Sequence, residues 1–486
     1  MSQGEPKSSA FHAVLRLTVE HALRYLEKLD TISISPTVSL PDLRHRLHKP
    51  LPDGSTGAKQ VIEELIVNTA GGIMGNSGGR FFAWAIGGTL PAALAADWLS
   101  STWNQCAAIA ASSPAAAVAE EVCGMWLKEL FRLPSTASFA LVSGCQMAHI
   151  TCLAAARNSL LARYGWDHEI EGLGGGAPRI QVLSSVERHG SIDRAVRLLG
   201  IGSRSIVDLP VGENGCLTAE TLNEALKQYS GGPVIVVLQA GDLNIGAYDP
   251  FAELVPLAHR WGAWVHVDGA FGLWAAASPA HRHLLSGSEE ADSWATDGHK
   301  WLNVPYDCGY AFVADSQAHR NSMSYHASYL TQQPDVRDQI HWNPEWSRRG
   351  GRGFATYAAL HQLGKAGIAL LVKRCCHLAQ TMIEQIAALP GAELMWKSSV
   401  NQGLVRFVAH TASADHDRWT DAVISAVAES GEAFFSGTTW RGKRCMRVSV
   451  LNWQTNEDDV SRAVGALRRL LEKGQGQTCP YIEKKS

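Results

Sequence analysis

The sequence predicts an α/β protein with a mainly parallel sheet that is covered by helices on both faces, followed by a small α+β unit. Two observations favour this fold class. Between residues 139 and 313, short apolar runs of strand length alternate with longer segments of helical periodicity. Residues 404–472 then alternate strand and helix again on a smaller scale. Strands that alternate with helices are typical of parallel sheets with both faces buried.

The N-terminal residues are expected to form a helical arm rather than a domain. Residues 13–28 have an amphipathic pattern, and residues 33–52 contain Ser and Pro in an arrangement typical of an irregular connection between helices. The apolar residues 83–96 are too few to cross a bilayer, so a buried helix is predicted there. Helical periodicity continues over residues 98–133.

The strands and helices of the two following parts are expected in a regular order. Strands are predicted at residues 139–142, 180–183, 234–238, 264–267, 310–313, 404–408 and 446–450. Helices are predicted up to Arg157, from Ser191, and at residues 251–260, 419–429 and 457–472, before a polar tail over residues 473–486. The chain is therefore divided into an N-terminal helical arm (1–95), a large domain (96–375) and a small C-terminal α+β domain (376–486).

Composition and charge argue against several classes of function. The 43 basic and 46 acidic residues give a net charge of −3 without blocks of like charge, so neither nucleic acid nor a membrane surface is an expected partner. The first 26 residues mix charged and apolar side chains, unlike a signal peptide. The ten cysteines form no Cys-x-x-Cys pair and no cluster with metal-ligand spacing. These features predict a cytoplasmic protein with reduced thiols and no metal site.

Two segments carry the strongest chemical indication. WVHVDGAFG places Asp268 at the end of an apolar strand, and DSWATDGHKW contains Lys300. Pyridoxal 5′-phosphate (PLP) chemistry needs a lysine amine that forms an imine and a carboxylate that keeps the pyridine nitrogen protonated. The carboxyl end of a parallel strand is also where such sheets bind ligands. Taken singly, Lys300 is more typical of a solvated turn, and Asp268 is equally typical of a cap.

As a set, HVDGAFG, DSWATDGHKW and the DCG of residues 307–309 resemble the group II pyridoxal-dependent decarboxylases. That family includes aromatic amino acid, glutamate and histidine decarboxylases, and the resemblance extends over residues 60–470. It implies the PLP-dependent transferase fold type I with a seven-stranded type of sheet. It also implies a homodimer with a shared active site, in which the N-terminal arm is exchanged.

The resemblance assigns cofactor-binding roles to individual residues. Lys300 is the imine-forming lysine, Asp268 pairs with the pyridinium nitrogen, and Ala270 packs against the ring. His189, in SSVERHGSIDRA, matches the residue that stacks on the opposite ring face. Outside this family context, a histidine at that place is more typical of a surface turn.

The phosphate is expected at VSGCQMAHITCLAAAR, where a strand ends and a helix begins. Gly144, Cys145 and Gln146 are the expected contacts, and the resemblance adds His299, with Asp297 where relatives carry Asn or Asp. Because the family more often has Ser, Ala or Gly in this turn, the individual side-chain roles stay open, and a plain strand-to-helix turn is the alternative.

One candidate for selectivity is a departure from the family pattern. In LQAGDLNIGAYDPF, Asp242 stands where a threonine is usual. A carboxylate near the cofactor or the substrate would shift the pKa values of its neighbours. Asp242 and Asn244 are therefore candidate cofactor-binding and specificity residues.

Two further segments resemble regions that line the substrate pocket of the family. GGRFFAWAIGGTLPAALAADWL offers Phe81, Phe82 and Trp84, for which an ordinary core position is an equal alternative. WSRRGGRGFATYAAL offers Arg352, for which a solvated basic turn is the alternative. The aromatic residues favour an aromatic or apolar substrate, and Arg352 leaves an acidic one open.

The expected mobile loop is the largest departure from the family. Only TQQPDVRDQI lies between Leu330 and His341, where animal decarboxylases carry a longer loop with a tyrosine that protonates the carbanion. Either Tyr329, His326 or His189 supplies this proton, or the reaction is not a simple decarboxylation.

The preferred hypothesis is decarboxylation of an L-amino acid to an amine and carbon dioxide. The alternatives are other PLP reactions: transamination, aldehyde-lyase cleavage, or oxygen-dependent decarboxylation with deamination to an aldehyde. A non-catalytic binding protein on the same fold is disfavoured because Asp268, His189 and Lys300 are all present.

Overall fold

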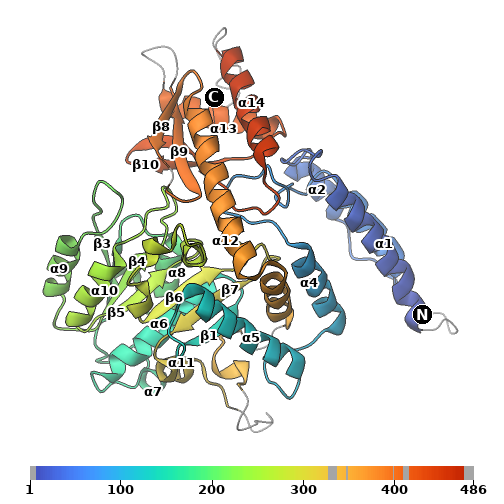
Figure 1. Ribbon diagram of the computed structural model, residues 1–486. Coiled ribbons are helices and arrows are strands. Elements are labelled where there is room, and N and C mark those ends of the chain that lie inside the picture. The colour runs from blue at the N-terminus through green and yellow to red at the C-terminus, as the bar shows by residue number, and fades with distance from the viewer. Residues whose placement is uncertain (1–6, 327–336, 346–348, 398, 409–414, 475–486) are drawn as a thin grey trace.

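The computed structural model describes residues 7–326, 337–345, 349–397, 399–408 and 415–474. Figure 1 shows an N-terminal helical segment that extends away from the body, a central sheet flanked by helices, and a smaller C-terminal sheet with its own helices. Across the described ranges, no helix combines the length and the apolar character needed to cross a bilayer.

The central sheet has seven strands in the order β1-β7-β6-β5-β4-β2-β3. Neighbouring strands are parallel except at β7, which runs antiparallel to both β1 and β6. The strands are β1 (Ser138–Val142), β2 (Gln181–Ser185), β3 (Ile206–Leu209), β4 (Val234–Gln239), β5 (Trp264–Asp268), β6 (Ser293–Asp297) and β7 (Gly309–Val313). The mainly parallel sheet predicted from the sequence is confirmed.

Helices cover both faces of this sheet. Alternate residues of β1 face opposite sides, so that Phe139 and Leu141 belong to one hydrophobic core and Ala140 and Val142 to the other. The helices here are α4 (Pro91–Trp103), α5 (Pro114–Phe131), α6 (Cys145–Ala162), α7 (His168–Glu171), α8 (Gly190–Leu198), α9 (Ala219–Gln228), α10 (Phe251–Arg260) and α11 (Ser316–Met323). Short 3₁₀ helices are Ser203–Ser205, Gly272–Ala277, Arg282–Leu285, Ser288–Glu290 and Gln339–His341.

Two strands of the sheet lie outside the predicted set. β3 is a short edge strand, and β6 carries Ser293, Thr296 and Asp297 within a fully buried run. These polar side chains are tolerated in the interior because they are hydrogen-bonded; the Trp264 indole, for example, donates to Ser293 Oγ at 2.9 Å. A search for apolar runs misses a buried strand of this kind.

The N-terminal part departs from the sequence-based expectation in two places. It contains α1 (Lys7–Glu27), α2 (Leu40–Leu47) and α3 (Ala58–Thr69). α2 lies inside the segment expected to be irregular, and Ser39 caps it by accepting from the Asp42 amide. The helix expected over 83–96 begins only at Pro91, because Trp84 and Ala85 have left-handed backbone conformations with φ 55°.

The single helix expected over 98–133 is two helices, α4 and α5. Asn104 ends α4 in a left-handed conformation with φ 50°, and Pro114 begins α5 in its first turn. α5 then ends at Phe131, where Arg132 is again left-handed.

The C-terminal part is a four-stranded antiparallel sheet in the order β10-β11-β9-β8. Its elements are β8 (Ala392–Trp396), β9 (Gln402–Phe407), α13 (His416–Glu429), β10 (Ser436–Trp440), β11 (Lys443–Ser449) and α14 (Glu457–Gly474). The long helix α12 (Gly351–Ala387), interrupted at Gly364, runs from the central sheet to this one (Figure 1). The predicted boundary between residues 375 and 376 falls inside α12, and the domain limits remain a prediction.

Candidate active site

The candidate site is built on the carboxyl ends of two neighbouring parallel strands. β5 ends at Asp268, which pairs with Ala295 of β6, and β6 ends at Asp297. Asp268 is 5% exposed. The Lys300 amine, just after β6, lies 3.2 Å from Asp297 Oδ2 and 5.8 Å from the centre of the Phe271 ring. The sheet thus brings the two residues with the strongest chemical indication to one edge.

The N-terminus of α6 meets the same edge. Gly144 is the N-cap with φ 154°, a conformation that favours glycine, and no side chain caps the helix. The Cys145 amide donates to Asp297 Oδ1 at 2.6 Å. Gln146, the second residue of the helix, has no helical carbonyl four residues before it, and its side chain donates to the Ser191 carbonyl at 3.2 Å.

His299 lies beside this turn. Its Nδ1 is 2.8 Å from the Cys308 carbonyl, its Nε2 is 3.7 Å from Asp297 Oδ1, and its ring stacks on Tyr306 with centres 4.6 Å apart. Burial lowers the pKa of His299 below its ordinary value. The imidazole is therefore held mostly neutral and in a fixed orientation.

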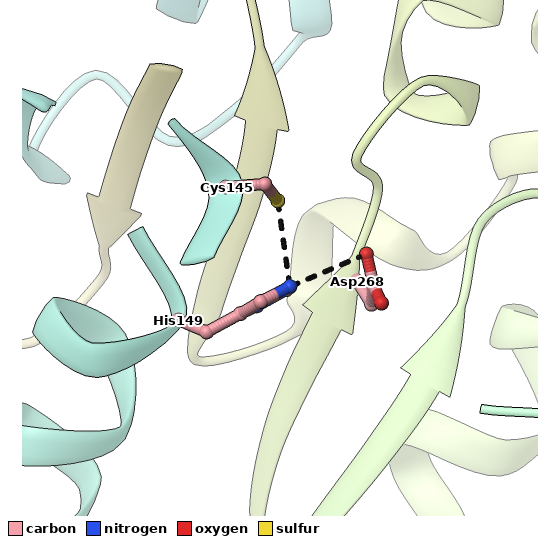
Figure 2. A group of neighbouring side chains, drawn as sticks. All are labelled: Cys145, His149 and Asp268. Carbon is pink, nitrogen blue, oxygen red and sulfur yellow. Dashed lines mark hydrogen bonds and ion pairs between the residues drawn. The ribbon is translucent and has the colours of Figure 1, made fainter. Parts of the chain in front are cut away.

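The side of the site around Asp268 is fully enclosed. Figure 2 shows His149 of α6 between Cys145 and Asp268: its Nε2 lies 3.4 Å from Cys145 Sγ and 3.6 Å from Asp268 Oδ1. The other ring nitrogen, Nδ1, lies 2.9 Å from His266 Nε2. Burial lowers the pKa of both histidines to about 3 and raises the pKa of the Cys145 thiol well above its ordinary value. At neutral pH the three groups are uncharged.

Within the described residues, Cys145, His149 and Asp268 form the one group whose ligand atoms lie close enough together to hold a metal ion. The sequence analysis expected no metal site. Asp268 is also the carboxylate that the predicted cofactor requires, so a metal ion and the cofactor could not use it together.

His189 is at the N-terminus of α8 and is exposed. Its Nδ1 accepts from the Ser191 amide at 3.2 Å and lies 2.7 Å from Ser191 Oγ. Because Gln146 donates to the Ser191 carbonyl, the start of α8 is tied to the start of α6. A protonated His189 is near enough to lower the pKa of His149.

Segments from both ends of the chain fix the loop that carries Lys300. Asn303, at φ 53°, accepts through Oδ1 from the Gly88 amide at 2.6 Å and from the Trp453 amide at 3.0 Å. Its Nδ2 donates to the Leu451 carbonyl at 3.0 Å. A Cβ atom at Gly87 would overlap the Lys300 carbonyl, so glycine is required for this close approach.

Comparison with known proteins agrees with this geometry. The family model described as the pyridoxal-dependent decarboxylase conserved domain matches residues 41–410. The chain belongs to the pyridoxal-dependent decarboxylase family. The aromatic-L-amino-acid decarboxylase of Bacillus atrophaeus is 26% identical over 486 residues, which cover 97% of each protein. The 4-hydroxyphenylacetaldehyde synthase of Rhodiola rosea is 24% identical, covering 92% of this chain and 93% of the relative.

A crystal structure of Oryza sativa TDC with PLP and tryptamine superposes with a TM-score of 0.90. It covers 97% of this chain and 100% of the other at 23% identity. At that identity the comparison shows the fold, and the fold class predicted from the sequence is confirmed.

The residues of the site fit the cofactor of the decarboxylase family. A Cβ at Gly144 would lie 3.5 Å from both Asp297 Oδ1 and His299 Cε1, so the uncapped start of α6 faces these two side chains. Helix N-termini with free amides bind phosphate. Asp268 is a buried carboxylate suited to a pyridinium nitrogen, and the Lys300 amine is suited to the aldehyde carbon. The Cys145 amide is occupied by Asp297, which leaves the Gln146 amide as the better phosphate donor.

The structure places Asp242 in the interior of its own loop. Its carboxylate accepts from the amides of Asn244, Ile245 and Ala247 at 2.7 to 3.1 Å. Asn244 in turn donates to Glu187 at 3.3 Å and accepts from Thr438 of β10 at 2.8 Å. Asp242 therefore closes a loop, and Asn244 connects the two sheets. Ala270, by contrast, is at the site, where its amide donates to Asp268 Oδ1 at 3.2 Å.

Of the three aromatic candidates, Phe81 and Trp84 contact each other and both contact Phe434, whereas Phe82 packs separately. Phe81 stacks on Phe434 with ring centres 5.1 Å apart, and the fully buried Phe82 stacks on Phe435 at 5.3 Å. These are packing contacts with the C-terminal part, as the core alternative expected. Trp84 is 51% exposed and is the one of the three with a ring open to a ligand.

Arg352 lies at the edge of the site in a network that the sequence did not reveal. It forms ion pairs with Asp307 at 3.0 Å and Glu345 at 3.5 Å, and Glu345 accepts from the Ser143 amide at 2.7 Å. Arg352 also lines a cavity of about 210 Å³ together with Tyr306. It is thus a bridge between α12 and the turn before α6 rather than a solvated arginine.

Of the three candidate proton donors, Tyr329 lies outside the described residues. His326 is exposed, and its ring centre lies 5.1 Å from that of His341. His189 is the candidate that the structure ties directly to the start of α6.

The sequence analysis missed His149 and His266, although their spacing could have indicated them. Cys145 and His149 are four residues apart on a helix and so share a face. His266 and Asp268 are two apart on a strand and also share a face. These two faces meet because α6 packs across the sheet and contacts β5.

Proposed function

We propose that this protein decarboxylates an L-amino acid to the corresponding amine and carbon dioxide. The observation that carries the proposal is the placement of Asp268, Asp297 and Lys300 at adjoining strand ends beside an uncapped helix N-terminus. Membership of the pyridoxal-dependent decarboxylase family supports the same reaction class.

Each residue of the site has a defined task in this reaction. When bound, PLP supplies an electron sink for the bond that breaks at the substrate Cα. Lys300 presents the amine that binds the cofactor, and Asp297 holds that amine in place. The Gln146 amide at the start of α6 and His299 would bind the phosphate, and the ionised Asp268 would keep the pyridine nitrogen protonated at the enclosed end of the site. His189 covers the open side, where it can orient the carboxylate that leaves.

We propose an aromatic L-amino acid as the substrate. The relative from Bacillus atrophaeus is named for that class. Trp84, which is 51% exposed, lies three residues before Gly87, whose amide donates to the His299 carbonyl at 3.3 Å, so an aromatic side chain stands close in the chain to the Lys300 loop. The acidic alternative that Arg352 left open is less favoured. Two carboxylates already neutralise Arg352, so it has little remaining attraction for a substrate carboxylate.

Oxygen-dependent formation of an aldehyde is the second candidate. Two observations favour it: no tyrosine occurs in TQQPDVRDQI, and a relative is named 4-hydroxyphenylacetaldehyde synthase. Without a loop tyrosine as proton donor, delivery of a proton to the substrate Cα would be slower, and reaction with oxygen could then compete.

Product analysis separates the two candidates. The purified protein, loaded with PLP, is incubated with L-Trp, L-Tyr, L-Phe, L-Glu and L-Asp, with and without oxygen, and the products are identified by mass spectrometry. We expect an amine from an aromatic substrate under both conditions. An aldehyde that needs oxygen would establish the second candidate, and a keto acid would exclude both.

We also propose a cytoplasmic homodimer. α1 leaves one apolar stripe exposed, with Phe11, Leu15, Val19 and Leu23 at four-residue spacing and 39–66% exposure. Figure 1 shows the N-terminal helical segment, in which α1 packs against α3, projecting from the body of the chain. A second copy would bury the stripe. The nine described cysteines are all free thiols, as a reducing compartment favours.

The dimer is tested by light scattering of the full chain and of the variant Leu15→Glu, Leu23→Glu. We expect the mass of two chains for the natural protein and of one chain for the variant. A monomeric natural protein would refute the proposal.

A further inference from the structure

A row of hydrogen-bonding side chains continues behind Asp268 into the interior. His149 Nδ1 is 2.9 Å from His266 Nε2, and His266 Nδ1 is 2.9 Å from Ser293 Oγ. The Trp264 indole closes the row by donating to the same Ser293 oxygen at 2.9 Å. His149, His266, Ser293 and Trp264 are at most 1% exposed, and Asp268 is 5% exposed. Five side chains from α6, β5 and β6 therefore form one polar path through an otherwise apolar core.

The carboxylate end of this row sets its direction, and the indole end is compatible with it. An indole N–H can only donate, and an ionised carboxylate can only accept. The histidines are neutral, so each carries one N–H and one lone pair. In the arrangement that suits both ends, Ser293 donates to His266 Nδ1, His266 donates from Nε2 to His149 Nδ1, and His149 presents its Nε2–H toward Asp268.

The opposite arrangement is disfavoured at the carboxylate. With its proton on Nδ1, His149 would turn the Nε2 lone pair toward Asp268 Oδ1, 3.6 Å away, and two acceptors would then face each other in a buried place. The Cys145 thiol, 3.4 Å from Nε2, could donate to that lone pair, but a thiol is a weak donor. The carboxylate is the stronger partner and selects the N–H.

We propose that His149 and His266 are positioning residues: through the chain from Trp264 and Ser293 they present an N–H to Asp268, which keeps this carboxylate ionised and the proton on the pyridine nitrogen of the cofactor. A buried carboxylate without such a donor would take the proton itself, leaving a neutral ring that is a weaker electron sink. The proposal depends on the proposed function in one respect: it requires that the protein binds PLP, but not that the reaction is a decarboxylation.

Other titratable groups face this row and must be kept unchanged in a test. Asp297, Lys300 and His189 act on His149 through their charges, and Cys145 touches it. Cys152 of α6 lies beside Ser293. None of the substitutions below removes one of these groups.

The test reads the cofactor nitrogen directly. The protein is loaded with PLP labelled with ¹⁵N in the ring, and the ¹⁵N chemical shift is followed from pH 6 to pH 9 in the natural protein, His149→Phe and His266→Phe. In His149→Phe we expect the pKa of the ring nitrogen to fall by about one unit or more, with a smaller fall in His266→Phe. His149→Gln, whose amide accepts on one side and donates on the other, should restore much of the shift.

Thr151→Val is the matched control, because Thr151 is buried on the same helix and donates only to the Met147 carbonyl. It should leave the ¹⁵N shift unchanged. An unchanged shift in both histidine variants, or an equal change in the control, would overturn the proposal. Because the readout is protonation and not turnover, a wrong assignment of the reaction would leave this result intact.

A second measurement needs no variant and so does not depend on whether a buried substitution folds. Neutron diffraction from deuterated crystals of the natural protein with bound PLP locates the protons. We expect deuterium on Nε2 of both His149 and His266. Deuterium on Nδ1 of either ring would reverse the chain and overturn the proposal.

Discussion

The two sides of the candidate active site are built differently. On the enclosed side, Asp268, His149 and His266 are buried and lie in one row of contacts between α6 and β5. On the open side, His189 is exposed, and the Lys300 side chain is 19% exposed with Asp297 as its partner. The enclosed side is part of the packed interior, whereas Lys300 on the open side must leave Asp297 to bind a cofactor. Substitutions on the enclosed side should therefore cost stability as well as activity, and those on the open side mainly activity.

The largest expected effect on activity comes from the open side. Lys300→Ala should lower turnover by more than about 10³-fold, the scale on which covalent catalytic residues act. The melting temperature without cofactor should change little, because the removed amine is partly exposed. The measurements are steady-state product formation, the visible absorbance of bound PLP and thermal unfolding. Near-normal turnover would show that another group binds the cofactor.

The largest expected effect on stability comes from the enclosed side. His266→Ala removes the partner of both His149 Nδ1 and Ser293 Oγ and opens a cavity, so the free energy of unfolding should fall by about 2–4 kcal/mol. Urea unfolding of the protein without cofactor at pH 7 measures this loss. A change below about 0.5 kcal/mol would mean that the enclosed side is not as tightly organised as its contacts indicate.

His189→Asn is the counterpart on the open side. Asparagine retains the cap of α8 but removes the ring, so the free energy of unfolding should stay within about 0.5 kcal/mol. Turnover should fall by about 10²-fold if His189 orients or protonates the reacting group. The same urea and product assays are used. Loss of stability without loss of turnover would show that His189 has a structural role, as expected for a residue of the enclosed side, and would contradict its place on the open side.

Acid should act on the enclosed histidines. Burial lowers the pKa of His149 and His266 to about 3, from an ordinary value of 6.5, so the unfolded chain binds more protons than the folded one between these values. The contribution of these two neutral histidines to the free energy of unfolding is complete above pH 6.5 and is lost progressively as the pH falls toward 3. Urea midpoints measured from pH 7 to pH 4 should fall steadily. A flat profile would contradict the neutral, buried state of these rings.

The smallest expected effect has the opposite sign and lies away from the site. A hydrogen bond to Asp292 at 3.0 Å raises the pKa of His259. The contribution of the His259–Asp292 pair to the free energy of unfolding is complete below the pKa of 6.5 that His259 has in the unfolded chain. It is lost as the pH rises through the higher pKa of the folded state. The side chain is 37% exposed, so screening limits the effect of His259→Gln to below about 1 kcal/mol at pH 5.5. At pH 8.5 the variant and the natural protein should have equal urea midpoints.

The open side was easier to predict from the sequence than the enclosed side. Lys300, His189 and His299 stand in motifs where residue type and order carry the chemistry. His149 and His266 come into contact only when α6 packs against β5. This contact between distant segments cannot be predicted from either segment alone. The polar strand β6 was missed for the same reason, since its Ser293 is buried with a partner, Trp264, from another strand.

Local backbone conformation explains the remaining errors. The apolar composition of residues 83–96 predicts a helix, but Trp84 and Ala85 are left-handed and turn the chain toward the Lys300 loop. Asp242 was placed near the cofactor because of its position in a motif. Its carboxylate accepts from three amides of its own loop, an interaction that the residue type alone does not predict, and its role at the cofactor stays a prediction.

Asn303 sets an order of events during synthesis of the chain. The loop of Lys300 is held by Gly88 on one side and by Leu451 and Trp453 on the other. A ribosome that has just made Lys300 still has to add the second of these supports, well over a hundred residues further along the chain. Cofactor capture is therefore a late step, and a nascent or truncated chain that lacks the C-terminal part holds its lysine in a loop that is not yet shaped for PLP.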